Sequence, residues 1–312
     1  MWISLGCLVG LPLLAIAVIR LFFFEQWIQL KLDWYTSQGR SDRALPLVKA
    51  QFQRLRGSKG ENHIATNAAR YSLGQIQYEN GLKEDGRAMV DKATEFFTHY
   101  QGPKDALFAL YLMNLGLAQR AIDRGDQAIE SLQMVLSIQR NKSPLKVDEV
   151  ARTLLNLGAM LEEAGRQNEA VKILEESLQM RVSKYGQNSI EVAKVKLNLA
   201  EALIGLEKWT EAERNLRQAI EVLKIYPTQD LGNAYDTYAR LMEAQDRLVE
   251  AEPMRQASTT ALQRALGEKS VEVAKQMEKQ AALLGRLNRY TEQGLYGKKA
   301  TEIREALKCT VS

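Results

Sequence analysis

The chain has 312 residues, of which 46% are hydrophobic and 26% are charged, and its formal net charge is +4. This composition is that of an ordinary globular protein, and because acidic and basic residues alternate along the chain, no surface for nucleic acid is expected. The two cysteines lie at opposite ends and the two histidines are far apart, so neither a disulfide framework nor a zinc site is predicted.

Residues 1–24 predict a transmembrane anchor. Residues 1–19 carry no charge, and the apolar run continues beyond Arg20 as LFFF. A helix over residues 2–24 would span about 34 Å, which exceeds a hydrocarbon core of about 30 Å. The alternative is a cleaved signal peptide, but the run is long and no basic segment precedes it. Basic residues follow the span, so we expect a single-pass protein whose remainder is cytoplasmic.

Small residues recur along the rest of the chain at a step of 42 residues, shortened once to 39. One series comprises Ala44, Gly86, Ala128, Ala170, Ala212, Ala251 and, in place of a small residue, Gln293; the other comprises Leu32, Gly74, Gly116, Gly158, Ala200, Ala239 and Ala281. Members of the two series stand about 12 residues apart across a turn, a spacing that lets two antiparallel helices approach closely. The pattern predicts about seven helix pairs over residues 25–308, followed by a tail at 309–312.

The pattern Leu157-Gly158, Leu161, Ala170, Leu174 resembles a tetratricopeptide repeat. The 42-residue period and the connector YGQNSIEVA at 185–193, repeated as LGEKSVEVA at 266–274, are similar to the repeats of kinesin light chains. The resemblance implies an all-α, right-handed α-solenoid. It also implies that the first helix of each pair lines a concave face, which commonly binds an extended peptide or a partner's helix.

No constellation of residues predicts catalysis, a cofactor or a bound metal. The sequence GSKG at 57–60 lacks the preceding strand of a phosphate loop, and the adjacent acids Glu162 and Glu163 would point about 100° apart on a helix. His63, Ser189 and Ser270 occupy equivalent connectors, where each can cap the next helix. We therefore expect a protein that is not an enzyme.

Five successive units place a short polar side chain two residues before the small position of the predicted first helix. These residues are Ser72, Asn114, Asn156, Asn198 and Thr237. An amide both donates and accepts hydrogen bonds, so this ladder can pair with the backbone of a bound chain. The alternative is that each side chain bonds a neighbouring helix and only orders the stack.

Three of these units also carry a polar side chain four residues earlier, on the same helical face. The pairs are Arg152 with Asn156, Lys194 with Asn198, and Asn233 with Thr237. A cation beside an amide suits a carboxylate-bearing ligand and resembles the carboxylate clamp of chaperone-binding tetratricopeptide domains. The third pair lacks the clamp's basic residue, so an acidic or mixed peptide is expected rather than a C-terminal carboxylate. The alternative for Arg152 and Lys194 is ordinary surface charge.

Together these features predict a membrane-anchored scaffold that binds a protein partner in a groove. The alternative is a self-assembling solenoid or homo-oligomer, in which the atypical last unit supplies the interface.

Overall fold

The computed structural model describes residues 35, 40–225 and 228–309. These residues form thirteen α-helices and no strand. The helices are α2 (Ser41–Lys59), α3 (Ile64–Glu79), α4 (Lys83–Thr98), α5 (Ala106–Ala121), α6 (Gly125–Arg140), α7 (Val147–Glu163), α8 (Gln167–Tyr185), α9 (Ile190–Gly205), α10 (Trp209–Leu223), α11 (Gln229–Ala244), α12 (Leu248–Leu266), α13 (Val271–Arg286) and α14 (Tyr290–Cys309). The predicted anchor at residues 1–24 lies outside the described residues. Within them, no helix combines the length and the apolar character needed to cross a bilayer.

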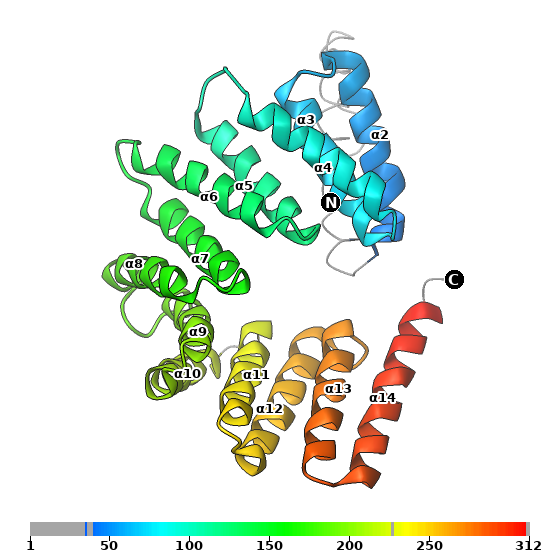
Figure 1. Ribbon diagram of the computed structural model, residues 1–312, viewed down its shortest axis with the longest axis vertical. Coiled ribbons are helices and arrows are strands. Elements are labelled where there is room, and N and C mark those ends of the chain that lie inside the picture. The colour runs from blue at the N-terminus through cyan, green and yellow to red at the C-terminus, as the bar shows by residue number, and fades with distance from the viewer. Residues whose placement is uncertain (1–34, 36–39, 226–227, 310–312) are drawn as a thin grey trace, which may run out of the picture. The chain divides into compact units, whose positions relative to one another are not determined.

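The helices divide between two compact units, residues 1–135 and 136–312, with the boundary inside α6. In unit 1, α3 packs against α2, α4 and α5. In unit 2, contacts join each helix from α7 to α14 to the next, as α11 to α14 show in Figure 1. Short turns connect the helices of a pair, so the pairs are antiparallel hairpins, as the repeat predicts.

Small residues set the distance between paired helices. A Cβ atom added at Gly74 on α3 would lie 2.6 Å from the carbonyl oxygen of Gly86 on α4, and one added at Gly158 would lie 2.5 Å from Cγ of Leu174. Ala170, the partner of Gly158 in the other series, is completely buried. The predicted close approach of the two helices is therefore confirmed.

The turn inside each helix pair contains one residue in the left-handed region. These residues follow the repeat period and are Gly81, Asp123, Gly165, Glu207, Asp246 and Asn288, with φ between 56° and 85°. Glycine adopts this conformation without a steric cost, whereas a residue with a side chain is strained there. The turn geometry is thus kept in all six pairs, although the residue type at this position changes.

The connectors between pairs supply helix caps. His63 Nδ1 accepts a hydrogen bond from the backbone N–H of Ala65 at 3.1 Å. Ser189 and Ser270 accept from the backbone N–H three residues ahead, at 3.3 and 3.2 Å. These caps satisfy donors that the first turn of a helix leaves without a partner, and the predicted capping role is confirmed.

Candidate partner-binding face

Every residue of the predicted polar ladder lies on the first helix of a pair. Unit 1 holds Ser72 on α3 and Asn114 on α5, and these two helices contact each other. Unit 2 holds the remaining six candidates on α7, α9 and α11, and α9 contacts both of the other two helices. Within each unit, the candidates therefore occupy neighbouring helices at equivalent positions.

The two candidates in unit 1 interact with other residues of the protein. The Ser72 hydroxyl donates to the carbonyl oxygen of Ala68 on its own helix, at 3.2 Å. The Asn114 amide is exposed and lies near the hydroxyl of Tyr71 on α3. Burial raises the pKa of the Tyr71 hydroxyl, and the nearby Asn114 amide offsets part of this rise. Asn114 is therefore exposed and also adjoins the neighbouring first helix.

Leucines surround Asn114 on the exposed side of α5. Leu107 and Leu110 are each 50% exposed and Leu117 is 38% exposed. Their positions, three or four residues apart and in register with Asn114, place them on one face of the helix. The polar ladder therefore interrupts an apolar stripe in unit 1, a property that the ladder alone does not predict.

In unit 2, Arg152 and Asn156 lie one turn apart on α7, with Arg152 exposed and Asn156 half-buried. Arg152 forms no ion pair with any residue in the described part of the chain. Its positive charge helps to lower the pKa of Arg181 on α8, an effect to which burial of Arg181 contributes most. Arg152 is thus an exposed cation without an acidic partner.

The second pair is bound to the next first helix. Lys194 Nζ on α9 lies 3.0 Å from Oδ2 of Asp230 on α11. Asn198, one turn further along α9, is half-buried. The ion pair therefore satisfies Lys194 within the protein, an internal partner that the sequence does not predict.

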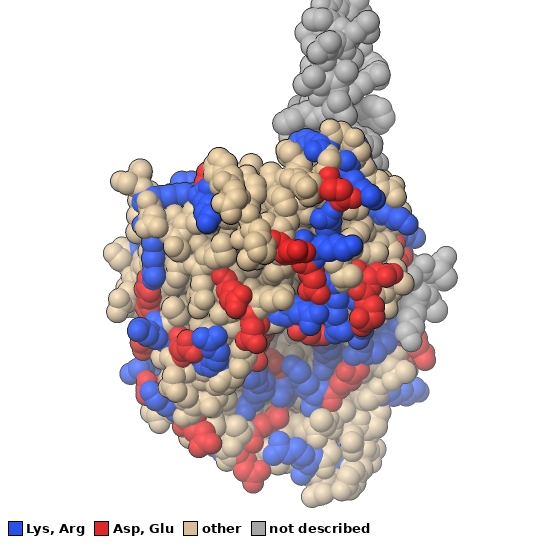
Figure 2. Space-filling view, turned by 45° about the horizontal axis from the view of Figure 1, so that its top comes forward, with Lys and Arg blue, Asp and Glu red and all other residues tan. Residues whose placement is uncertain are grey.

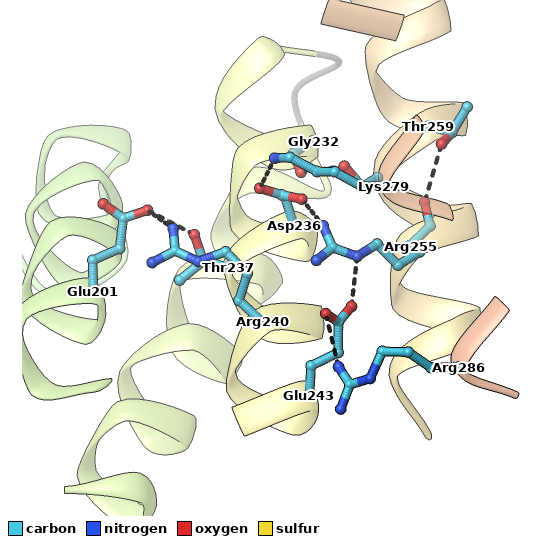
Figure 3. Close-up of polar contacts among 11 residues, drawn as sticks. Glu201, Gly232, Asp236, Thr237, Arg240, Glu243, Arg255, Thr259, Lys279 and Arg286 are labelled. Atoms are coloured by element: carbon cyan, nitrogen blue, oxygen red, sulfur yellow. Dashed lines mark hydrogen bonds and ion pairs between the residues drawn. The ribbon is translucent and has the colours of Figure 1, made fainter. Parts of the chain in front are cut away.

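The third pair divides into an exposed and a buried member. Asn233 on α11 is exposed, whereas Thr237 is only 1% exposed. The Thr237 hydroxyl donates to Oε1 of Glu201 on α9 at 2.8 Å, and Nη1 of Arg240 lies 3.7 Å from the same oxygen (Figure 3). Thr237 therefore connects two first helices, and we leave it out of the contact set proposed below.

Acidic residues stand one turn before the cation position on each first helix of unit 2. They are Glu149, Glu191, Asp230 and Glu272, separated by one repeat each. These acids were not predicted as site residues, although they follow the same repeat period as the amides. Figure 2 shows basic and acidic side chains interleaved over the displayed surface rather than separated by sign. We name the surface formed by Glu149, Arg152, Asn156, Lys194, Asn198, Asp230 and Asn233 the first-helix face of unit 2.

A buried ion-pair network fixes the helices that follow this face. Arg255 of α12 forms an ion pair with Asp236 of α11, and its Nε donates to Oε1 of Glu243 at 2.8 Å. Lys279 of α13 reaches the other oxygen of Asp236 at 2.7 Å, and Arg286 lies 3.7 Å from Glu243 (Figure 3). Three consecutive helices are thereby joined through two carboxylates.

The described part of the chain offers no cluster of metal ligands at this face. Throughout residues 40–225 and 228–309, no three His, Cys, Asp or Glu side chains are grouped so that they could hold a metal ion. The face presents charged and amide groups on neighbouring helices.

Residues 149–225, which run from the start of α7 to the end of α10, match the family model for the tetratricopeptide repeat. This segment of the chain is similar to the tetratricopeptide repeat. A search of curated proteins finds no significant match. The family match falls on the helices that carry Arg152, Asn156, Lys194 and Asn198.

Solved structures of other repeat proteins share the fold. A tetratricopeptide repeat protein from Parabacteroides merdae has 15% identity, a TM-score of 0.57, and coverage of 92% of this chain and 98% of its own. A putative kinesin light chain repeat protein from Podosopora anserina has 17% identity, a TM-score of 0.55, and coverage of 64% and 96%. A Rap protein complexed with competence and sporulation factor has 13% identity, a TM-score of 0.56, and coverage of 90% and 78%. The predicted resemblance to tetratricopeptide and kinesin light chain-like repeats is confirmed, and so is the all-α solenoid fold.

Proposed function

We propose that this protein is a membrane-anchored, non-enzymatic scaffold that binds a partner's peptide or helix on the first-helix face of unit 2. Tetratricopeptide repeats are typical of protein–protein interaction, and this supports the general class. The finer assignment rests on one observation: exposed Arg152 lacks an ion-pair partner within the described residues, while half-buried Asn156 lies one turn away on the same helix.

The charges of the face favour a partner of mixed charge. Arg152 offers a cation without an acidic partner, whereas Glu149 on the same helix and Asp230 on α11 carry carboxylates that pair with Lys146 and Lys194. A uniformly acidic peptide would compete with these carboxylates for the two lysines, because like charges brought together oppose binding. A peptide with an acid opposite Arg152 and a base near Asp230 would match both. Asn198 and Asn233 are left to hydrogen-bond the backbone of the peptide.

The anchor at residues 1–24 remains part of the proposal because of its length and apolar character. We place the repeats on the cytoplasmic side, since seven basic residues between Arg20 and Arg56 follow the apolar run. Carbonate extraction of membranes tests the anchor, and protease protection in sealed vesicles tests the side. Release of the full chain by carbonate would contradict the anchor.

The binding face is tested by affinity capture from native membranes with an Arg152→Glu, Asn156→Ala double variant. The variant leaves Lys194 intact, because reversing that charge would place two acids 3.0 Å apart and destabilise the contact between α9 and α11. Proteins captured by the wild type and lost with the variant support the proposal. Lys172→Glu on the exposed side of α8 makes the same charge change on the second helix of the pair and should leave capture intact. An identical set of captured proteins with wild type and double variant would contradict the proposal.

Self-assembly through the last helix is the second candidate. Tyr290 and Leu295 of α14 are 66% and 51% exposed, which is unusual for large apolar side chains at the end of a repeat stack. Sedimentation of the full chain in neutral detergent at increasing concentration tests this. A protein that stays monomeric at all concentrations would exclude self-assembly. A dimer that the Leu295→Lys variant fails to form would support self-assembly.

A further inference from the structure

A pocket of about 650 Å³ lies in unit 2 between α8, the connector to α9, and α10. Its polar lining includes Gln187, Lys196, Arg214 and Gln218. Lys196 and Asn198 are two residues apart on α9, so their side chains leave the helix about 200° apart. The pocket therefore lies on the other side of α9 from the first-helix face and is separate from the function proposed above.

Lys196 is a buried cation without a carboxylate partner. The residue is 8% exposed, and Nζ makes a long hydrogen bond of 3.4 Å to the neutral side-chain oxygen of Gln187. No ion pair joins Lys196 to any acid among the residues that the structure describes. Burial lowers the pKa of the ammonium group, because removal from water disfavours the charged form.

Packing does not require a lysine at this position. One and two repeats earlier, the equivalent residues are Leu154 on α7 and Leu112 on α5, which are 0% and 2% exposed. A leucine therefore fills the same place in two other helix pairs of this chain. The charge at Lys196 has a cost that the fold avoids elsewhere.

Three repeats earlier, in unit 1, a basic residue does occupy the equivalent position, but there it is neutralised. Arg70 on α3 forms an ion pair with Glu61 of the preceding connector and also bonds the side chain of Asn67. It contributes to a pocket of about 540 Å³ at the corresponding place. The residue equivalent to Glu61 in unit 2 is Gln187. The pocket of unit 2 thus keeps the buried cation and replaces its counter-ion with a neutral amide.

The other charges around the pocket leave it positive. Arg214 makes no ion pair with any described residue, whereas Nη2 of Arg217 lies 2.6 Å from Glu213. The one acid in the lining, Glu221, is neutralised by Lys224 at 2.8 Å. Lys196 and Arg214 therefore remain without internal counter-ions.

From the buried cation, its missing counter-ion and the surrounding donors, we infer that this pocket binds an oxyanion, the phosphate or carboxylate group of a small ligand. Lys196 and Arg214 supply the positive charge, and the amides of Gln187 and Gln218 supply further donors. The bound oxyanion takes the role that Glu61 fills in unit 1, and hydrogen bonds between charged groups give it affinity.

The test is thermal unfolding of the full chain in neutral detergent, with inorganic phosphate or citrate compared against chloride at equal ionic strength. A ligand that binds only the folded state raises the unfolding temperature. We expect the unfolding temperature of the wild type to rise. The anion that raises it more identifies whether the pocket prefers a phosphate or a carboxylate group. Lys196→Leu copies the residue of the two preceding units and should lower the affinity by at least about tenfold.

A second variant separates binding from folding. Gln187→Glu restores the internal counter-ion of unit 1 and should stabilise the protein in chloride while abolishing the response to phosphate and citrate. Lys172→Leu, on the exposed side of α8, is the matched control and should respond like the wild type. Addition of the anion should also raise the pKa of Lys196, measured by NMR of labelled lysine side chains. An unresponsive wild type, or a full response in both Lys196→Leu and Gln187→Glu, would overturn the inference.

Discussion

Asp236 of α11 and Arg255 of α12 form an ion pair that is almost completely withdrawn from water, with the two residues 8% and 4% exposed. Transfer of both charges from water is costly, and the surrounding contacts offset this cost. Lys279 reaches the second oxygen of Asp236, and Glu243 accepts a hydrogen bond from Arg255. Each charge therefore depends on the presence of the others.

Removal of one member should strongly destabilise the protein. Asp236→Ala leaves Arg255 buried beside a single carboxylate, so the free energy of unfolding should fall by about 3–5 kcal/mol. Arg286→Ala is the control, since its side chain is 46% exposed and its ion pairs are 3.4 Å or longer; its effect should stay below about 1 kcal/mol. Urea unfolding followed by circular dichroism measures both. Similar small losses for the two variants would show that the network is not coupled.

The backbone of the turn after α9 is strained, because a residue with a side chain occupies the left-handed region there. Glu207 has φ of 56°, whereas the equivalent turns one and three repeats earlier hold Gly165 and Gly81. Glu207→Gly should therefore stabilise the protein by about 1 kcal/mol, and Gly165→Ala should destabilise it by a similar amount. Thermal unfolding of the two variants beside the wild type gives the signs. The two variants should change the stability of the protein in opposite directions. A loss of stability in both would contradict the strain at Glu207.

The contact between α3 and α4 tests whether the small residues are needed for close packing of paired helices. A methyl group at Gly74 would lie 2.6 Å from a backbone oxygen and 2.8 Å from Cγ2 of Val90, so the helices would have to separate. We expect Gly74→Ala to lower the free energy of unfolding by about 1–3 kcal/mol. Gly294→Ala on α14 meets nothing within 4 Å and should instead stabilise its helix by up to about 1 kcal/mol. Denaturant midpoints measure both changes, and a neutral Gly74→Ala would show that the contact can relax.

Alkaline pH should weaken unit 1 through Tyr71. Burial raises the pKa of this hydroxyl above its ordinary value of 10.0. The folded state therefore favours the neutral phenol. The stability that this neutral hydroxyl contributes is complete below pH 10.0 and is lost as the pH rises above that value. The unfolding temperature of the wild type should fall more steeply than that of Tyr71→Phe above this pH. Parallel curves for the two proteins would show that Tyr71 does not control the alkaline transition.

The Glu61→Gln variant places beside Arg70 in unit 1 the neutral amide that Gln187 supplies beside Lys196 in unit 2. Arg70 would lose its carboxylate partner but stay buried. Because the Glu61 side chain is 47% exposed, water weakens this ion pair, and the variant should be less stable by about 1–2 kcal/mol. Phosphate or citrate should recover part of this loss by replacing the missing carboxylate. Thermal unfolding in the two salts and in chloride measures the recovery. Equal losses in all three salts would show that Arg70 is closed to anions.

The sequence predicted helix pairing better than it predicted side-chain partners. A 42-residue period of small residues reports the separation of two helices directly, so Gly158 and Ala170 were placed correctly. The ion pair of Lys194 was not predicted, because spacing along one helix does not reveal the reach of a long side chain to Asp230 on the next first helix. Thr237 was predicted either to meet a ligand or to bond a neighbouring helix, and its buried hydroxyl donates to Glu201 of α9.

For the polar ladder too, the sequence predicts a position but not the partner of the side chain at that position. The series from Ser72 to Thr237 correctly identified one position on the first helices, and at Thr237 this position carries a hydrogen bond to a neighbouring first helix. The repeat period shows that the position is equivalent in each unit. It does not show whether a neighbouring helix supplies the partner, because that depends on residues such as Tyr71 and Glu201 that lie outside the series.

The ion pair between Lys194 and Asp230 affects how a partner could use the first-helix face. A carboxylate that approached Lys194 would have to displace Asp230, and the displaced Asp230 would then be available to a cation of the same partner. Association by this route breaks one ion pair within the protein and forms two across the interface, which is a net gain of one. The strength of such binding would depend on the order of charges along the partner more than on its net charge, and added salt would weaken it less than it weakens association through unpaired charges.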